Sequence, residues 1–171
     1  MSRLESGQIT PRFDWCDVHD LANKVADNLE QELLHFKLST VIPSDMPLVL
    51  IDFGLTEQVL NNLVLNATQN AMPGTNIRLK FFFDQGALTI QVMDRGKGFP
   101  AAELLSVFDK FYRGKDSKAG GTGLGLSIVK GFVEAQGGTV MAENRKNGGA
   151  LFTIKIPVKS SEMDKLNKQE N

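Results

Sequence analysis

The stretch GGTGLGLSIVK (120–130) decides between the folds that this chain could adopt. Four glycines occupy six successive positions (120–125), and an apolar run with helical spacing follows directly. Glycines leave backbone N–H groups unobstructed, and the dipole of the following helix favours an anion at this point. The stretch predicts a phosphate-binding loop, with an ordinary glycine-rich entry into a helix as the alternative.

Three common glycine-rich loops do not fit this stretch. A Walker loop requires Gly-Lys-Ser or Gly-Lys-Thr, and neither occurs in the chain. A dinucleotide-binding turn follows a strand, but here a polar segment precedes the glycines, and Leu126 stands where the third glycine belongs. A protein-kinase glycine loop joins two strands, whereas a helix is expected here. The stretch therefore excludes these three folds, and the other motifs must identify the one that the chain adopts.

A second glycine motif, VMDRGKGFP (92–100), places Asp94 at the end of a predicted strand. A carboxylate there can accept a hydrogen bond from a base such as the amine of adenine. Gly96 and Gly98 would let the ring approach the backbone closely. An ordinary turn is the alternative interpretation.

Asn62 and Asn66 form a third element, since residues four apart share one face of a helix. Their neutral oxygen atoms suit a magnesium ion that takes further ligands from water and phosphate. Exposure to solvent or a bond to the backbone is the alternative for either asparagine.

The order of predicted elements favours an α/β two-layer sandwich, with a mixed, mostly antiparallel sheet and helices on one face. Helices are expected over 18–34, 54–72, 100–108 and 124–136, and strands over 35–43, 47–53, 76–83, 87–94, 139–144 and 150–157. A doubly wound sheet would require regular strand–helix alternation, which is missing.

Composition narrows the function classes. The 171 residues suit one domain, and a net charge of -1 gives no reason to expect a nucleic-acid partner. One cysteine, Cys16, excludes an internal disulfide, fits a reduced compartment and is expected to be a buried, unreactive thiol. No run reaches the roughly 18 apolar residues of a membrane span.

Five motifs occur together in one order: NNLVLNA (61–67), DRGKG (94–98), FDKFYR (108–113), GGTGLGLSIVK (120–130) and GGALFTIKIP (148–157). Over residues 17–158 the chain resembles the catalytic ATP-binding domain of sensor histidine kinases. That resemblance implies the fold shared with gyrase and Hsp90, the Bergerat fold, with an ATP lid loop over 112–120. RFDWCDVHDL (12–21) and the segment 42–63 resemble most the Kdp-type potassium sensor kinases.

The resemblance implies roles for the matching residues. Asp94 would bind the adenine amine, Asn66 would ligate magnesium, and Asn62 would assist it in catalysis. The phosphates would be wrapped by the backbone of Gly121, Thr122, Gly123, Leu124 and Gly125. Further nucleotide contacts would come from Gln69, Asn70, Gly96, Gly98, Phe108, Lys110, Phe111, Arg113 and Leu126.

Three positions depart from the family pattern. Gln69 and Asn70 stand where a lysine and an aromatic residue are common, and Ala150 replaces a common threonine. The departures spare Asp94 and Asn66, so we expect weaker nucleotide binding and an intact site. They also motivate an alternative, a nucleotide-dependent pseudokinase or interaction module.

The resemblance also implies partners. Neither His19 nor His35 lies in a phosphoacceptor motif, so the phosphoacceptor histidine is expected on a separate dimerisation domain of the same parent, for relay to an aspartate on a response regulator receiver domain. An asparagine at position 62 cannot activate water as a base, which favours transfer over hydrolysis. A serine kinase of the anti-sigma type, which shares the fold, is a further alternative.

The resemblance suggests three segments. Residues 1–16 would be the end of a dimerisation helix and a linker, 17–158 the ATP-binding domain, and 159–171 a polar tail that frays. We expect a monomeric cytoplasmic fragment of a homodimeric, membrane-associated parent.

Overall fold

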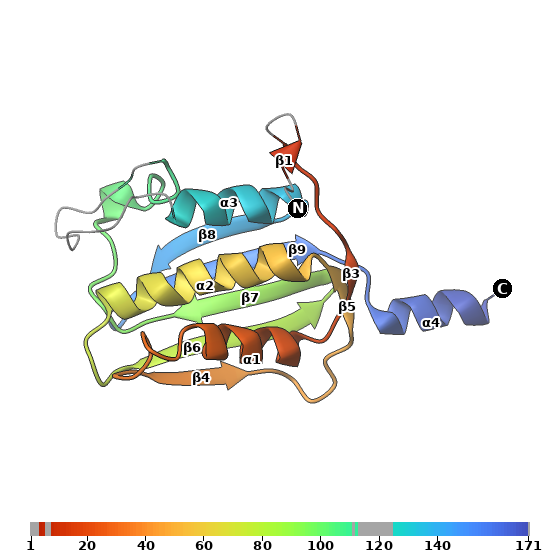
Figure 1. Ribbon diagram of the computed structural model, residues 1–171, viewed down its shortest axis with the longest axis horizontal. Helices are drawn as coiled ribbons and strands as arrows, with labels where there is room; N and C mark the ends of the chain where they lie inside the picture. The colour runs from red at the N-terminus through yellow and green to blue at the C-terminus, as the bar shows by residue number, and fades with distance from the viewer. Residues whose placement is uncertain (1–3, 6–7, 111, 113–124, 171) are drawn as a thin grey trace.

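A five-stranded sheet covered on one face by helices forms the body of the molecule (Figure 1). The structure is a computed structural model that describes residues 4–5, 8–110, 112 and 125–170. The strands run in the order β4 (Lys37–Val41), β6 (Asn76–Asp84), β7 (Ala87–Met93), β9 (Ala150–Pro157) and β8 (Thr139–Asn144). The helices α1 (Val18–Asn28), α2 (Phe53–Asn70) and α3 (Gly125–Ala135) cover one face. The predicted two-layer sandwich is confirmed.

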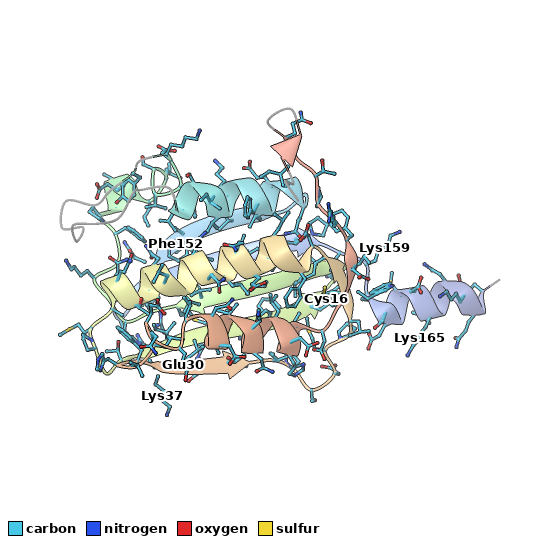
Figure 2. The ribbon with its side chains drawn as sticks, in the orientation of Figure 1. Cys16, Glu30, Lys37, Phe152, Lys159 and Lys165 are labelled. Carbon is cyan, nitrogen blue, oxygen red and sulfur yellow. The ribbon has the colours of Figure 1, made fainter. Side chains whose placement is uncertain are left out.

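Strand pairing matches the predicted mixture of directions. β4 pairs with β6 in parallel, and the other pairs in this sheet are antiparallel. Lys37, on the edge strand β4, is exposed and points away from the body of the molecule (Figure 2). A lysine on an edge strand discourages pairing with another chain.

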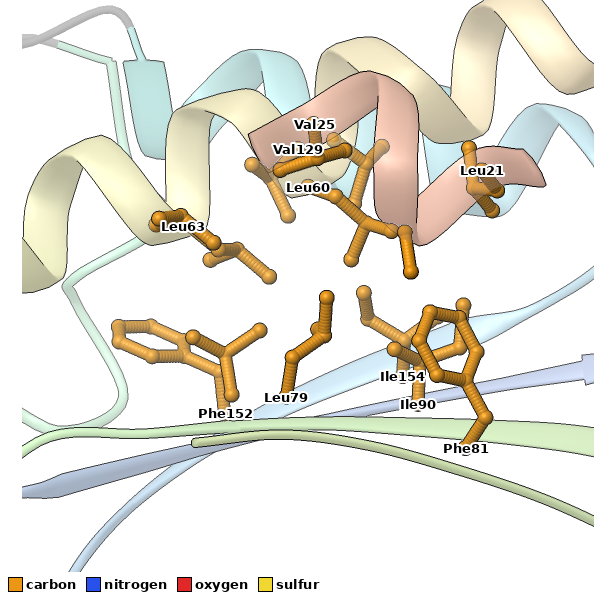
Figure 3. Packing of buried hydrophobic residues seen from close by; sticks show 14 of the residues in the cluster. Leu21, Val25, Leu60, Leu63, Leu79, Phe81, Ile90, Val129, Phe152 and Ile154 are labelled. Atoms are coloured by element: carbon orange, nitrogen blue, oxygen red, sulfur yellow. The ribbon is translucent and has the colours of Figure 1, made fainter. Parts of the chain in front are cut away.

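The core lies between the sheet and the helices (Figure 3). Alternate residues of β6 and β9 face inward, among them Leu79, Phe81 and Ile154, which are 0% exposed. Leu60 and Leu63 of α2 meet them from the helical layer. Each fully buried side chain of this size stabilises the fold by about 1.5–3 kcal/mol, so α2 is anchored along its length.

The helix α2 begins at a capping aspartate. The side chain of Asp52 accepts a hydrogen bond from the Leu55 N–H at 2.9 Å and is fully buried. Its backbone N–H bonds to Gln136 at 3.0 Å, at the end of α3. The start of α2 is therefore fixed to the end of α3. Within the part of the chain that the structure describes, no helix combines the length and apolar character needed to cross a bilayer.

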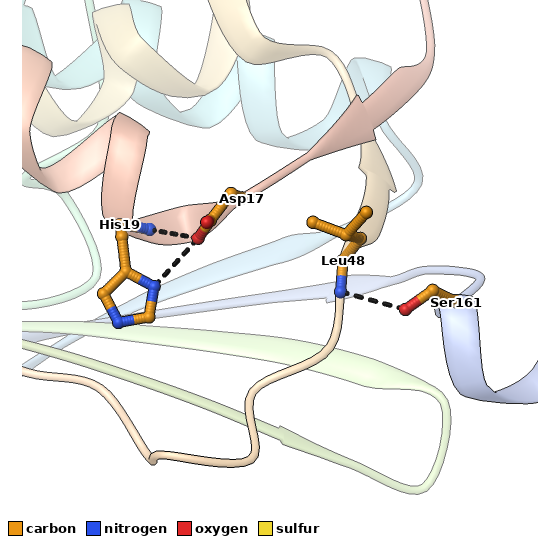
Figure 4. Close-up of polar contacts among 4 residues, drawn as sticks. All are labelled: Asp17, His19, Leu48 and Ser161. Carbon is orange, nitrogen blue, oxygen red and sulfur yellow. Dashed lines mark hydrogen bonds and ion pairs between the residues drawn. The ribbon is translucent and has the colours of Figure 1, made fainter.

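The first helix is shorter than the prediction of 18–34. α1 begins at its Asp17 cap, which binds His19 (Figure 4), and ends at Asn28. The chain then turns, since the carbonyl of His35 accepts a bond from the Gly74 N–H at 2.6 Å. The following residues must reach the edge of the sheet, where β4 begins, so the helix ends although the apolar spacing continues to Leu33.

The helix predicted over 100–108 is also wrong. One 3₁₀ turn, η1 (Ala101–Glu103), is followed by turns with the same three-residue repeat. The N–H groups of Glu103, Ser106 and Asp109 bond to carbonyls three residues earlier, at 2.9–3.0 Å. This tighter winding leaves Val107 fully buried and Leu105 exposed.

The amino-terminal segment, predicted as the end of a dimerisation helix and a linker, contains short strands. β1 (Leu4–Glu5) pairs with β2 (Gln8–Ile9), and β3 (Asp14–Cys16) pairs antiparallel with β5 (Val49–Ile51). The Cys16 thiol is buried and free, as predicted, and burial raises its pKa.

The tail does not fray as predicted, since it forms a helix, α4 (Ser161–Gln169), that extends away from the sheet (Figure 1). Ser160 is 0% exposed, and its side chain accepts a bond from the Met163 N–H at 3.3 Å. Ser161 binds both backbone groups of Leu48, which joins α4 to the start of β5 (Figure 4).

Candidate functional site

Asn62, Asn66, Asp94 and Gly125, all singled out from the sequence, lie at one end of the sheet. The carboxyl half of α2, the end of β7 and the starts of α3 and β9 meet there (Figure 1). Asn62, Asn66 and Asn70 lie four apart on α2, so they line one face over about 12 Å.

Glycines mark both ends of this face. A Cβ on Gly125, the first residue of α3, would lie 3.8 Å from Asn62 Oδ1. A Cβ on Gly96 would overlap the carbonyl oxygen of Asn70, and Gly96 forms a bridge with Ala71. The absence of a side chain at Gly96 is therefore a requirement of packing against the end of α2.

Asp94 is held at the end of β7 by the neighbouring backbone. It is 2% exposed. Its Oδ1 accepts bonds from the Gly96 N–H at 2.8 Å and from the Ala150 N–H at 3.1 Å. Among the described residues neither bond involves Oδ2. The carboxylate is thus fixed through one oxygen, which leaves the other to accept a bond from a ligand.

Burial raises the pKa of Asp94 above the ordinary value of 3.8, while the bonds from Gly96 and Ala150 and the charge of Arg145 oppose the shift. A raised carboxylate pKa means that ionisation costs the folded state free energy. The stabilising contribution is complete below the ordinary pKa and is lost as the pH rises through the raised one.

We therefore expect Asp94→Asn to gain stability relative to wild type as the pH increases from about 4 to 7. An amide still accepts the bonds at Oδ1 but has no charge to desolvate. Urea unfolding of both proteins across this range measures the difference. Parallel pH profiles for the two proteins would contradict this assignment.

Asn66 carries an unsatisfied acceptor. Its Oδ1 is buried and has no hydrogen-bond partner within the described residues. Such an oxygen costs about 1–3 kcal/mol, so a ligand is expected to satisfy it. The described residues hold no group of three His, Cys, Asp or Glu side chains that could bind a metal. An amide oxygen that relies on substrate phosphates and water for further ligands fits magnesium.

The other predicted contacts are distributed unevenly. Gln69, Asn70 and Lys110 are exposed, and the Asn70 amide bonds to the Asn66 carbonyl oxygen at 2.8 Å. The ring centroid of Phe108 lies 6.0 Å from that of Phe152, so Phe108 packs on the core beside the site. Leu126 also packs against the core, and Gly98 has a positive φ of 71°. Phe111, Arg113, Gly121, Thr122, Gly123, Leu124 and most of the expected lid lie outside the described residues.

Two residues that contact this site were missed from the sequence. Asn144 bonds to the backbone of Phe99, and Arg145 bonds to the carbonyl oxygen of Asp94. Their position before the turn at Gly148 and Gly149 indicated a hairpin and nothing more. Only the pairing of β8 with β9 brings them to Asp94.

Comparison with known proteins identifies the family to which this chain is similar. Residues 52–160 match the family described as histidine kinase-, DNA gyrase B- and HSP90-like ATPase. The sensor protein KdpD of Escherichia coli is 34% identical over 158 residues, which are 92% of this chain and 18% of KdpD. The sensor histidine kinase WalK of Bacillus subtilis is 29% identical, over 96% of this chain and 28% of WalK. The chain thus spans a minor part of these relatives.

Solved structures agree with the sequence relatives. Full-length ShkA in complex with AMPPNP superposes with a TM-score of 0.79 at 25% identity, over 90% of this chain and 32% of ShkA. The catalytic domain of the histidine kinase ThkA gives a TM-score of 0.76 at 26% identity, over 85% of this chain and 95% of that domain. The chain therefore belongs to the histidine kinase-, DNA gyrase B- and HSP90-like ATPase family, as a catalytic ATP-binding domain of the sensor histidine kinase type.

Proposed function

We propose that this domain binds ATP with magnesium and presents the γ-phosphoryl group to a histidine on a separate dimerisation domain of the same parent. The observation that carries the proposal is a pair of oxygens in one site. Among the described residues, Asn66 Oδ1 on α2 is buried without a partner, and Asp94 Oδ2 at the end of β7 takes no part in the two bonds that hold Oδ1. The Asp94 oxygen suits a base amine and the Asn66 oxygen a cation beside phosphates. ShkA, a structural relative, was solved with AMPPNP.

Asp94 recognises the base. Its ionised carboxylate accepts a hydrogen bond from the 6-amine of adenine through Oδ2, while Gly96 and Ala150 hold Oδ1. A buried bond to a charged group contributes about 1.5–3 kcal/mol. Ala150 binds Asp94 through backbone atoms alone and lacks the hydroxyl that a threonine would add. Recognition of the base therefore depends on the Asp94 carboxylate.

α2 and α3 receive the phosphates. The start of α3, at Gly125, is the positive end of the helix dipole and favours anions. Asn66 would hold magnesium with assistance from Asn62, and magnesium neutralises phosphate charge when bound. Asn62 lies beside the start of α3 and cannot act as a base toward water. The site therefore orients the terminal phosphoryl group for transfer and does little to promote hydrolysis.

The family relatives are multidomain sensor kinases, of which this chain matches a minor part. From them we infer the remaining assembly. The histidine accepts the phosphoryl group and passes it to an aspartate of a response regulator receiver domain. The parent is a membrane-associated homodimer whose catalytic domain lies in the cytoplasm.

Calorimetric titration with ATP and magnesium tests this function. We expect a submillimolar dissociation constant for wild type and a loss of about 100-fold in Asp94→Asn. Asp84→Asn is the matched control, because Asp84 is exposed at the β6–β7 turn. The same ATP, labelled at the γ-position, is then supplied with the parent's dimerisation domain.

Each contrary outcome selects an alternative. No heat at millimolar ATP would leave a pseudokinase or interaction module, which Gln69 and Asn70 first suggested. Label found on a serine of a partner protein, with none on histidine, would indicate a serine kinase of the anti-sigma type.

A further inference from the structure

The loop that carries Asp94 is held at both ends by the end of β8 and the residue that follows it. Asn144, the last residue of β8, accepts a bond from the Phe99 N–H at 2.8 Å through Oδ1. Its Nδ2 donates to the Phe99 carbonyl oxygen at 2.7 Å. One side-chain amide thus pairs with both backbone groups of a residue 45 positions away, as a neighbouring strand would.

Arg145 fixes the other end of the loop. Its Nη1 donates to the carbonyl oxygen of Asp94 at 2.7 Å, and its own backbone N–H donates to Gly149 at 2.8 Å. The neighbouring Ala150 exchanges two bonds with Asp94, from its N–H to Oδ1 at 3.1 Å and from the Asp94 N–H to its carbonyl oxygen at 3.0 Å. The β8–β9 hairpin therefore holds both the backbone and the carboxylate of Asp94 by hydrogen bonds.

The glycine spacing of the loop agrees with this arrangement. Gly98 has a positive φ of 71°, and a Cβ there would overlap Asn144 Oδ1. Gly98 thus leaves room for the Asn144 amide in its observed position, whatever ligand lies nearby. Phe99, which the amide holds, packs edge-on against Phe152 at 5.9 Å. Asn144 consequently fixes the point at which the loop leaves the site.

Stability alone accounts poorly for these contacts. Asn144 is exposed, and an exposed hydrogen bond contributes only about 0.5–1.5 kcal/mol. Recognition through a single carboxylate oxygen depends far more steeply on position, since a hydrogen bond weakens sharply when its length or angle is wrong.

We propose that Asn144 and Arg145 are positioning residues that orient the Asp94 carboxylate toward the 6-amine of a purine, and so set the preference of this domain for adenine over 6-oxo purine nucleotides. This inference rests on the proposed function. Neither residue belongs to the five motifs quoted from the sequence. Their effect reaches the nucleotide through Asp94, and the phosphate contacts at Asn66 and α3 do not depend on them.

Binding of ATP and ITP, each with magnesium, tests the proposal, because these nucleotides share their phosphates and differ at the 6-position of the base. In Asn144→Ala and in Arg145→Ala we expect the ATP dissociation constant to increase about tenfold, the equivalent of one hydrogen bond. ITP binding should stay within about twofold of wild type. The ITP/ATP ratio of dissociation constants therefore falls about tenfold.

The same hairpin offers matched controls. Asn147→Ala and Lys146→Ala remove exposed side chains close to the two residues and should keep the wild-type ratio. Should Asn144→Ala fail to fold, Asn144→Asp serves, since it keeps the acceptor for the Phe99 N–H and loses the donor to the Phe99 carbonyl. It should also lower the ratio.

Two results would overturn the inference while the proposed function stands: an unchanged ratio in Asn144→Ala and Arg145→Ala, or equal weakening of ATP and ITP, which would indicate a purely structural role. A wild-type protein without preference for ATP over ITP would instead contradict the role of Asp94, and the inference with it.

Discussion

Asn66→Ala is expected to lower phosphoryl transfer to the parent's dimerisation domain by at least about 100-fold. Asn66 Oδ1 is buried, and within the described part of the chain it has no partner. Its removal takes away the protein oxygen best placed to hold a cation beside the phosphates. Base recognition rests on a different residue, Asp94 at the end of β7, and should persist, so ATP should still bind in the presence of a chelator.

The same substitution should leave the empty domain at least as stable as wild type. Deleting a buried acceptor that lacks a partner relieves about 1–3 kcal/mol, which offsets the packing lost with the side chain. Function and stability would thus move in opposite directions, as expected where a fold retains a destabilising group for its activity.

Asn61→Ala is the matched control for Asn66→Ala. Asn61 lies on a different face of α2, where its Oδ1 accepts a weak bond from Asn28 of α1 at 3.4 Å. This variant should transfer phosphate at the wild-type rate. Initial rates over a range of magnesium concentrations, with urea unfolding of each protein, measure both effects. Wild-type transfer by Asn66→Ala at limiting magnesium would show that the metal is held elsewhere.

How far the sequence predicts this molecule depends on the range of the interactions involved. The strands of the main sheet and the helix carrying Asn62 and Asn66 follow from local periodicity, and the structure agrees with them. Two helix predictions were wrong. Residues 100–108 wind more tightly, through bonds between residues three apart, and α1 stops before residue 34, where the chain bonds to the distant Gly74 instead. The α4 cap at Ser160 had a readable signal, a serine followed by acidic residues in the first turn.

The site residues also fall into those that the sequence predicts and those that only the tertiary structure identifies. Asp94 and Asn66 were identified from motifs, and the structure places both at one end of the sheet with an oxygen left for a ligand. Asn144 and Arg145 escaped, because their role depends on the register of β8 against β9 and on backbone atoms of another loop. A side chain that binds backbone leaves no pattern in the sequence of its partner.

Gly149→Ala should disrupt both the fold and nucleotide binding. Gly149 has a φ of 104°, and a Cβ there would overlap the carbonyl oxygen of Asp94 and lie 3.0 Å from the Cα of Arg95. Neither neighbour can yield without displacing the loop that carries the base-recognising carboxylate. We expect a loss of about 3–5 kcal/mol in the free energy of unfolding, by conformational strain plus overlap. ATP affinity should fall at least about 100-fold.

Two other glycines separate strain from overlap. Gly148 has a φ of 96°, but its Cβ would lie 3.9 Å from the nearest atom, the carbonyl oxygen of Gly96, so Gly148→Ala should cost only about 1–3 kcal/mol and keep ATP binding. Gly96 itself lacks a positive φ, yet its Cβ would overlap the carbonyl oxygen of Asn70. Gly96→Ala should therefore lose ATP binding through overlap alone.

Urea unfolding and ATP titration of the three glycine variants measure the two contributions. If close approach to the backbone positions Asp94, the variants at 96 and 149 lose affinity together, while the variant at 148 loses only stability. Wild-type ATP affinity in all three variants would mean that the loop adapts to an added side chain. The Asp94 carboxylate would then reach the base from a position less fixed than its two backbone bonds indicate.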